Sequence, residues 1–214
     1  MKKKTVIMVA VCVAVVALTV VSFWQLGGFR KSGEALVCLD AGHGGNDFGA
    51  QNGSRLEKDD NLRLTLAVGE ILEDEGIKVI YTRKKDERKE LEERVAFANK
   101  KGATYFVSIH RNSADADVSG VEIWINNDAL LFEEKLAENI LEKIDEVGYG
   151  NSRGVRRGYQ GNPNGNYYVN SATDMPSCLI EMGFITTEED NILFDENFDE
   201  YARAIAQGII EGID

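Results

Sequence analysis

The 214-residue sequence is short of positive charge, and this shortage excludes one large class of function. Its 24 lysines and arginines stand against 36 aspartates and glutamates, which gives a net charge of −12. Proteins that bind nucleic acid neutralise its phosphates with basic side chains, so we expect no nucleic acid as a partner. Residues 1–32 hold five of the bases and none of the acids, which leaves −17 on the rest of the chain. That part therefore has no long-range attraction for an anionic surface.

Cysteine and histidine are scarce as well. The three cysteines are Cys12, in an apolar N-terminal segment, and Cys38 and Cys178, inside predicted buried strands. No spacing among them requires a disulfide, and we expect the last two to be free thiols that pack as small apolar side chains. The two histidines, His43 and His110, each end a predicted strand. We find no internal repeat and no second binding module, so the length fits one α/β domain with a substantial core.

The N-terminal segment has the composition of a membrane anchor. Lys2–Lys4 precede an apolar run over residues 5–24, which spans roughly 30 Å as a helix. The lysines favour a cytoplasmic N-terminus and an extracytoplasmic main domain. A cleaved signal peptide, which would release a secreted protein, is the alternative, but bulky residues at 23–25 occupy the place of a small-x-small cleavage site. We predict a basic tip, single-pass anchor and linker in residues 1–32, and a catalytic domain in residues 33–214.

Beyond the anchor, apolar runs typical of strands alternate with segments of helical periodicity. Strands are predicted over residues 35–40, 77–82, 104–110, 120–125 and 177–183. Helices are predicted over residues 58–75, 86–102 (with Asp86 as its N-cap), 128–147 and 198–213, with a short one from 186. Residues 148–166 are rich in Gly, Asn, Arg and Tyr and predict a long loop. This alternation predicts an α/β fold with a single twisted, mostly parallel sheet and helices on both faces.

Three of the predicted strands end in side chains that bind metals or move protons. The first runs into Asp40-Ala-Gly-His-Gly-Gly45, whose glycines allow a sharp turn and leave space beside the His43 imidazole. His110 ends the third strand and Glu181 lies in the fifth, while Glu57 follows in the loop after His43. Ligands of open parallel sheets bind outside the carboxyl ends of the strands, so these four side chains are expected at one edge.

Two histidines and one carboxylate form a catalytic zinc site that keeps an open position for water. A fourth acidic group nearby would be the general base of a hydrolase. The spacing alone does not decide which of Glu57 and Glu181 would ligate the metal and which would accept the proton.

At these residues the sequence resembles the zinc-dependent N-acetylmuramoyl-L-alanine amidases with an α/β catalytic domain. The resemblance runs from about Leu36 to the C-terminus, and it rests on Asp40-Ala-Gly-His-Gly-Gly-Asn-Asp-x-Gly-Ala50, Glu57-Lys58, Thr82-Arg83-x-x-Asp86, Leu91-x-x-Arg94, Ala98-Asn99, Ser108-Ile-His-x-Asn112 and Glu181-x-Gly-Phe184. It implies that His43, Glu57 and His110 bind one zinc ion and that Glu181 is the catalytic carboxylate. It also implies a peptidoglycan or muropeptide substrate, cut at the amide between N-acetylmuramic acid and L-alanine.

Basic and polar residues near the expected cleft are candidates for binding the substrate. Arg111 follows the second histidine, where the resembling family usually has a small residue, and Asn112 is part of the motif. Arg153, Arg156 and Arg157 form a basic cluster in an acidic domain, which predicts a clamp for stem-peptide carboxylates. A solvated surface loop is the alternative explanation of the cluster.

Other functions remain compatible with these residues. A zinc peptidase acting on wall peptides would need a similar site, and a non-catalytic wall-binding protein could share the fold. A small anchored amidase without a wall-binding module also resembles the sporulation and germination amidases of spore formers. We expect the cell membrane, through the N-terminal helix, and an activating or localising protein as further partners.

Overall fold

The computed structural model describes residues 35–115, 118–149, 151–162 and 164–213. These residues lie in one compact unit that spans 32–213. The predicted membrane anchor and its linker lie outside the described residues. Within the described ranges, no helix combines the length and the apolar character that crossing a bilayer requires.

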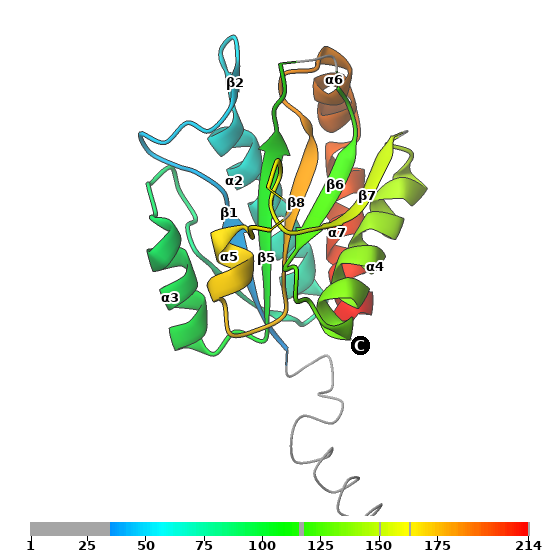
Figure 1. The fold of residues 1–214 in the computed structure, drawn as a ribbon. Helices are drawn as coiled ribbons and strands as arrows, with labels where there is room; N and C mark the ends of the chain where they lie inside the picture. The colour runs from blue at the N-terminus through cyan, green and yellow to red at the C-terminus, as the bar shows by residue number, and fades with distance from the viewer. Residues whose placement is uncertain (1–34, 116–117, 150, 163, 214) are drawn as a thin grey trace, which may run out of the picture. The chain divides into compact units, whose positions relative to one another are not determined.

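A six-stranded sheet runs through the middle of the domain (Figure 1). In spatial order its strands are β4 (Lys78–Tyr81), β1 (Leu36–Ala41), β5 (Tyr105–Asn112), β8 (Ser177–Phe184), β6 (Val121–Ile125) and β7 (Ser152–Arg157). The first four are parallel to one another, and β6 pairs antiparallel with β8 but parallel with β7. A small hairpin of β2 (Gln51–Asn52) and β3 (Arg55–Leu56) stands apart. The predicted mostly parallel α/β sheet is confirmed.

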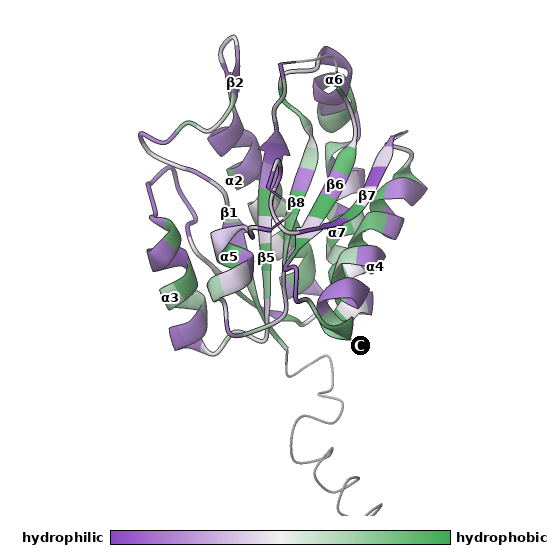
Figure 2. Cartoon of the chain, in the orientation of Figure 1, coloured by the Kyte–Doolittle hydropathy of each residue, from purple (hydrophilic) through white to green (hydrophobic). Residues whose placement is uncertain are grey.

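Helices cover the sheet on both faces. One face packs against α2 (Glu57–Asp74), α4 (Leu131–Val147) and α7 (Phe198–Ile213), and the larger apolar core lies there. The other face is covered in part by α3 (Leu91–Lys101) and the short α5 (Tyr168–Ala172), over a smaller core that includes Cys38 and Phe106. The last helix, α6 (Glu188–Glu196), follows β8. Figure 2 shows that β5 is hydrophobic along its length and hydrophilic at its carboxyl end. Because α3 and α5 cover only part of the second face, the carboxyl ends of the strands are open to a site on that face.

The structure corrects two predictions of local structure. The predicted loop 148–166 contains the edge strand β7, whose only apolar side chain is that of Val155. A strand paired on one side needs little apolar surface, and charged side chains on an edge oppose pairing with other chains, so its signal was weak. The helix expected from Asp86 begins at Leu91, with Glu90 as its N-cap. Asp86 instead accepts hydrogen bonds from Gly45 N and Lys58 Nζ, both at 2.6 Å. Cys38 and Cys178 are buried free thiols, as expected.

Candidate active site

A buried polar network fixes the end of β1, where the first histidine follows. The Asp40 carboxylate accepts hydrogen bonds from Thr82 Oγ1 at 2.5 Å and Ser108 Oγ at 2.7 Å, and it pairs with Arg94 Nη1 at 2.6 Å. Burial alone would raise the pKa of Asp40, but the Arg94 charge and the two hydroxyl groups hold it below its ordinary value. β1, β4, β5 and α3 are therefore joined at one point directly beneath the glycine-rich turn.

Arginine side chains then hold the backbone of the turn itself. Arg83 donates to the carbonyl oxygens of Ala41 and Gly42, each at 2.9 Å, and Arg94 Nη2 donates to that of His43 at 2.7 Å. His43 has φ 60°, the one positive φ among non-glycine residues in the described part of the chain. Such a conformation is strained and persists only where the surroundings impose it, which these arginines do.

The Asp40 network leads to a prediction of stability. We expect Asp40→Asn to lower the free energy of unfolding by about 3 to 5 kcal/mol, because Arg94 would remain buried without its charge partner. Since the pKa of Asp40 is lower in the folded than in the unfolded chain, its contribution is complete above the ordinary value of 3.8 and is lost as the pH falls through the folded value. Urea unfolding of both proteins at several pH values should show a difference that shrinks in acid. Equal midpoints at neutral pH would contradict this role, and Asp59→Asn, at an exposed position on α2, is the control.

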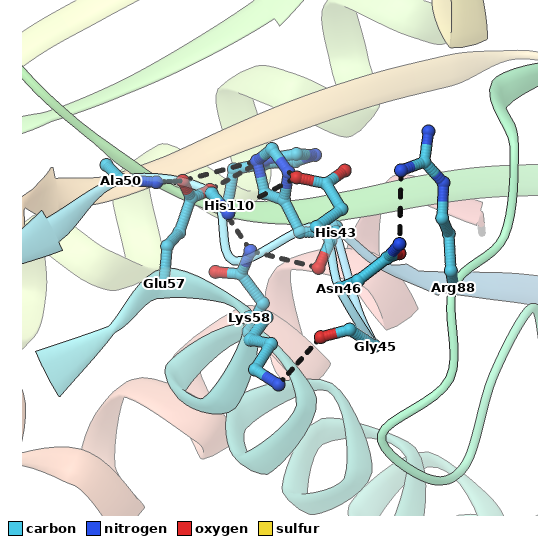
Figure 3. Close-up of polar contacts among 12 residues, drawn as sticks. His43, Gly45, Asn46, Ala50, Glu57, Lys58, Arg88 and His110 are labelled. Atoms are coloured by element: carbon cyan, nitrogen blue, oxygen red, sulfur yellow. Dashed lines mark hydrogen bonds and ion pairs between the residues drawn. The ribbon is translucent and has the colours of Figure 1, made fainter.

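Two histidines and Glu57 converge above this turn, as Figure 3 shows. The His43 Nε2 and His110 Nδ1 atoms lie 3.2 and 2.9 Å from the two carboxylate oxygens of Glu57. One possible ligand atom from each residue lies within 4.8 Å of the other two, so the three could hold a metal ion together. The predicted convergence of these strand ends and loops is thus present, with Glu57 as the first residue of α2.

Two glycines make room for these rings. A Cβ at Gly42 would overlap the His110 imidazole, and one at Gly49 would crowd both Glu57 and His43. Gly49 also has φ 66°, which disfavours other residues. The clearance expected from the glycine-rich sequence therefore serves both histidines.

Hydrogen bonds from residues outside the group orient two of the three side chains, Glu57 and His43. Glu57 accepts from Ala50 N at 2.8 Å and from Asn61 Nδ2 at 3.1 Å, and His43 Nδ1 lies 2.9 Å from Asp47 Oδ1. Burial opposes ionisation of Glu57, but the two histidines outweigh it and lower the pKa of its carboxyl well below the ordinary value. An ionised carboxylate and an oriented imidazole are the states in which these groups bind a metal.

Glu181 approaches the same place from the next strand. It pairs in register with His110 across β5 and β8, so the two side chains share one face of the sheet. Its side chain is buried, and its Oε2 atom has no hydrogen-bond partner among the described residues. Burial, followed by the negative charges of Glu57 and Glu122, raises the pKa of Glu181 well above the ordinary value. A buried, unpaired carboxyl with a raised pKa beside a candidate metal group is typical of a catalytic acid or base.

The predicted substrate-binding residues fall into two groups. Arg111 is only 2% exposed and donates to Asp60 Oδ2 at 2.7 Å and Asn191 Oδ1 at 2.8 Å. Since neighbouring strand residues point to opposite faces, Arg111 lies across the sheet from His110. Its guanidinium is thus occupied inside the protein, on the face away from the site.

Arg157 is also engaged elsewhere, through Glu134 and the carbonyl oxygens of Asn127 and Ala129. By contrast, Asn112 lies on the face of His110 and donates to Glu122 Oε1 at 2.9 Å. Arg153 and Arg156 approach the other carboxylate oxygen of Glu122, at 2.9 and 4.0 Å. Only these last three of the five predicted residues lie on the side of the sheet that carries the histidines.

Glu122 itself was not among the site residues predicted from the sequence. It is 3% exposed, and it pairs in register with Glu181 across β8 and β6. Its signal was a charged residue at an alternate position of the strand Gly120-Val-Glu-Ile-Trp-Ile125, where the apolar neighbours indicate burial. The antiparallel direction of β6, which brings Glu122 level with Glu181, cannot be read from that pattern.

Together, the α/β sheet, the three possible metal ligands and the adjacent carboxyl are the parts that a hydrolytic active site needs. A family model described as N-acetylmuramoyl-L-alanine amidase matches residues 37–214. The chain therefore belongs to the N-acetylmuramoyl-L-alanine amidase family, and it is an amide hydrolase of peptidoglycan. The family and the enzyme class expected from the motifs are confirmed.

Two proteins of Bacillus subtilis are similar to this chain over most of its length. The uncharacterized protein YqiI of Bacillus subtilis is 37% identical over 182 residues, which cover 83% of this chain and 82% of YqiI. The germination-specific N-acetylmuramoyl-L-alanine amidase of the same organism is 27% identical over 209 residues, which cover 89% of this chain and 82% of that amidase.

Two solved structures share the fold closely. The amidase AmiC2 of Nostoc punctiforme superposes with a TM-score of 0.74 and 38% identity, and the match covers 84% of this chain and 97% of AmiC2. The CwlD amidase from Clostridioides difficile, solved in complex with the GerS lipoprotein, gives a TM-score of 0.74 and 32% identity, covering 82% of this chain and 96% of CwlD. The similarity to amidases thus extends to the three-dimensional fold.

Proposed function

We propose that this protein is a zinc-dependent amidase that hydrolyses the lactyl–L-alanine amide between glycan and stem peptide in peptidoglycan. The observation that carries the proposal is the meeting of His43, Glu57 and His110 within 4.8 Å, beside the unpaired carboxyl of Glu181.

The donor set suits zinc. Two imidazoles and one carboxylate are ligands that catalytic zinc sites use, leaving a fourth position open. Bound there, zinc would supply Lewis acidity and lower the pKa of water to about 7. His43 and His110 would each offer a neutral ring nitrogen, and Glu57 would supply the negative charge.

Glu181 is proposed as the general base and then the general acid. In the carboxylate form it would accept a proton from the attacking water, and it would then donate that proton to the leaving amine of L-alanine. The Oε2 atom, which has no partner among the described residues, is free for this exchange. A raised pKa, caused first by burial, suits a group that must both take and release a proton near neutral pH.

Chelation tests the need for metal. We expect purified peptidoglycan to gain free amino groups when incubated with the protein, because each cut releases the amine of one L-alanine. Treatment with a chelator should abolish the reaction, and added zinc should restore it, since three protein ligands remain in place. Undiminished hydrolysis after complete metal removal would contradict the proposed mechanism, and a lack of any turnover with zinc bound would favour a non-catalytic wall-binding protein.

For substrate binding, we retain Asn112, Arg153 and Arg156 of the predicted residues. These side chains lie on the face of Glu181, and the two arginines offer charge-assisted hydrogen bonds to stem-peptide carboxylates. For Arg111 and Arg157 the observed partners account for the side chains without a substrate.

The location of the enzyme is also a proposal. The basic and apolar composition of residues 1–32 supports a single-pass anchor in the cell membrane with residues 33–214 outside the cytoplasm. The enzyme would then meet the wall through its anchor, in spite of its acidic domain. Since CwlD is described in complex with the GerS lipoprotein, a membrane-associated partner that localises or activates this enzyme is proposed by analogy.

A further inference from the structure

Glu122 is a buried carboxylate that accepts hydrogen bonds from side chains of three strands, β5, β6 and β7. Its Oε1 atom accepts from Asn112 Nδ2 at 2.9 Å and from Trp124 Nε1 at 3.0 Å. Its Oε2 atom accepts from Arg153 Nε at 2.9 Å, and Arg156 Nε lies 4.0 Å away. A carboxylate removed from water costs free energy unless such partners compensate it, so this cluster is built around the charge of Glu122.

The cluster continues the row of active-site side chains across the sheet. His110 pairs in register with Glu181, and Glu181 with Glu122, on three adjacent strands. In-register residues of neighbouring strands share one face, so all three side chains lie on the face that carries the candidate metal group. Arg153 comes from β7, the strand beyond β6, and reaches back over β6 to this row.

Arg153 is held in a way that leaves its outer nitrogens for another partner. Its hydrogen bond to Glu122 uses Nε, and the guanidinium carbon lies 5.2 Å from the centre of the Phe184 ring. The side chain is 30% exposed. Arg156 approaches the same carboxylate oxygen only to 4.0 Å, beyond hydrogen-bond distance, so Glu122 does not fully occupy its guanidinium either. Two arginine side chains therefore face this part of the site in a domain whose net charge is strongly negative.

We propose that Glu122 is a positioning residue that fixes Arg153, with Arg156 beside it, as a receptor for one carboxylate of the stem peptide. This inference rests on the proposed amidase function, and it adds a specificity: the enzyme prefers substrates in which that carboxylate is free over those in which it is a carboxamide. The two Nη groups of Arg153 match the geometry of a carboxylate, which an amide cannot replace because it presents one oxygen and one donor. Without Glu122, the long Arg153 side chain loses the contact that orients it.

Matched substrates test the inference. A pair of synthetic muropeptides that differ only by a stem-peptide carboxylate or carboxamide is given to the wild type, Arg153→Met and Glu122→Gln, with Arg203→Met on the remote face of α7 as the control. We expect the wild type and the control to have a KM roughly tenfold lower for the acid, as charge-assisted hydrogen bonds imply. Both site variants should lose this preference because their KM for the acid rises to that for the amide, and the ratio of the two KM values is the readout. The double variant should lose no more than either single one, since the two residues act together.

Several outcomes would overturn the inference. If Glu122→Gln lowers the rate on both substrates equally and keeps the preference, Glu122 has a structural role only. If Glu122→Gln does not fold, as judged by circular dichroism, Arg153→Met decides the question. An unchanged preference for the acid in Arg153→Met would overturn the inference.

The inference can fail separately from the proposed function. Hydrolysis of both muropeptides with equal KM would contradict the carboxylate receptor and leave the amidase function intact. Calorimetry with the free stem peptide and its carboxamide gives a readout without turnover. The wild type could bind the acid preferentially, lose this preference in Arg153→Met, and hydrolyse neither muropeptide. That result would contradict the amidase function and support the carboxylate receptor.

Discussion

Glu181→Gln should lower kcat by a factor of about 10² to 10⁴ while the protein keeps its zinc. General acid–base catalysis contributes rate factors of this size, and glutamine cannot accept the proton of the attacking water. The substitution preserves the shape of the side chain, and it removes a buried carboxyl whose Oε2 has no partner among the described residues, so the fold should not be weakened. The measurement is kcat on muropeptides together with zinc content by atomic spectroscopy.

Glu57→Gln is the matched comparison, because it makes the same chemical change 124 positions earlier in the chain, at the start of α2. It removes the negative charge between the two histidines, so both zinc retention and activity should fall. If Glu181→Gln loses zinc while Glu57→Gln retains it, Glu181 is the metal ligand and Glu57 is the general base. Wild-type turnover by Glu181→Gln would contradict the mechanism.

His110→Ala should lose both the metal and the activity. The ring is one of the three possible ligands, and its Nδ1 atom lies 2.9 Å from Glu57 Oε1. The only other histidine of the sequence, His43, is already a member of the same group and cannot replace it. A site with two ligands binds zinc weakly, so dialysed protein should contain little metal, and hydrolysis should fall to the background rate.

Gln207→Ala, on the exposed side of α7, is the control for dialysis and handling. Full zinc occupancy in His110→Ala would remove this histidine from the ligand set. If His110 is a ligand, the metal-free wild type and the metal-free variant should unfold at similar temperatures, since the substitution removes metal binding and not packing. A variant that unfolds at a much lower temperature would point to a structural role for the ring.

The central part of the site could be predicted from the sequence because each residue ends a strongly patterned element. His43, His110 and Glu181 follow or close buried apolar runs, and parallel strands bring such positions to one edge. Gly42 and Gly49 were visible as a glycine-rich turn, and the clearance that they give the imidazoles is a direct consequence of their missing Cβ atoms.

The outer part of the site could not be predicted, for two physical reasons. β7 is an edge strand with a polar sequence, so its arginines looked like a loop, and only the tertiary fold shows that Arg153 turns toward Glu122 while Arg157 turns toward Glu134. The direction of β6 depends on long-range pairing that no local pattern encodes. Arg111 is different, because it is the neighbour of His110 in a strand. Successive side chains of a strand point to opposite faces, so the sequence alone could have excluded Arg111 from the substrate-binding residues.

Mass spectrometry of the products from purified peptidoglycan tests the central claim most directly. We expect intact glycan strands that carry free lactyl groups, and released peptides that begin with L-alanine, in equal amounts. Released peptides that lack an N-terminal L-alanine, with L-alanine still attached to the glycan, would show a peptidase instead and contradict the claim.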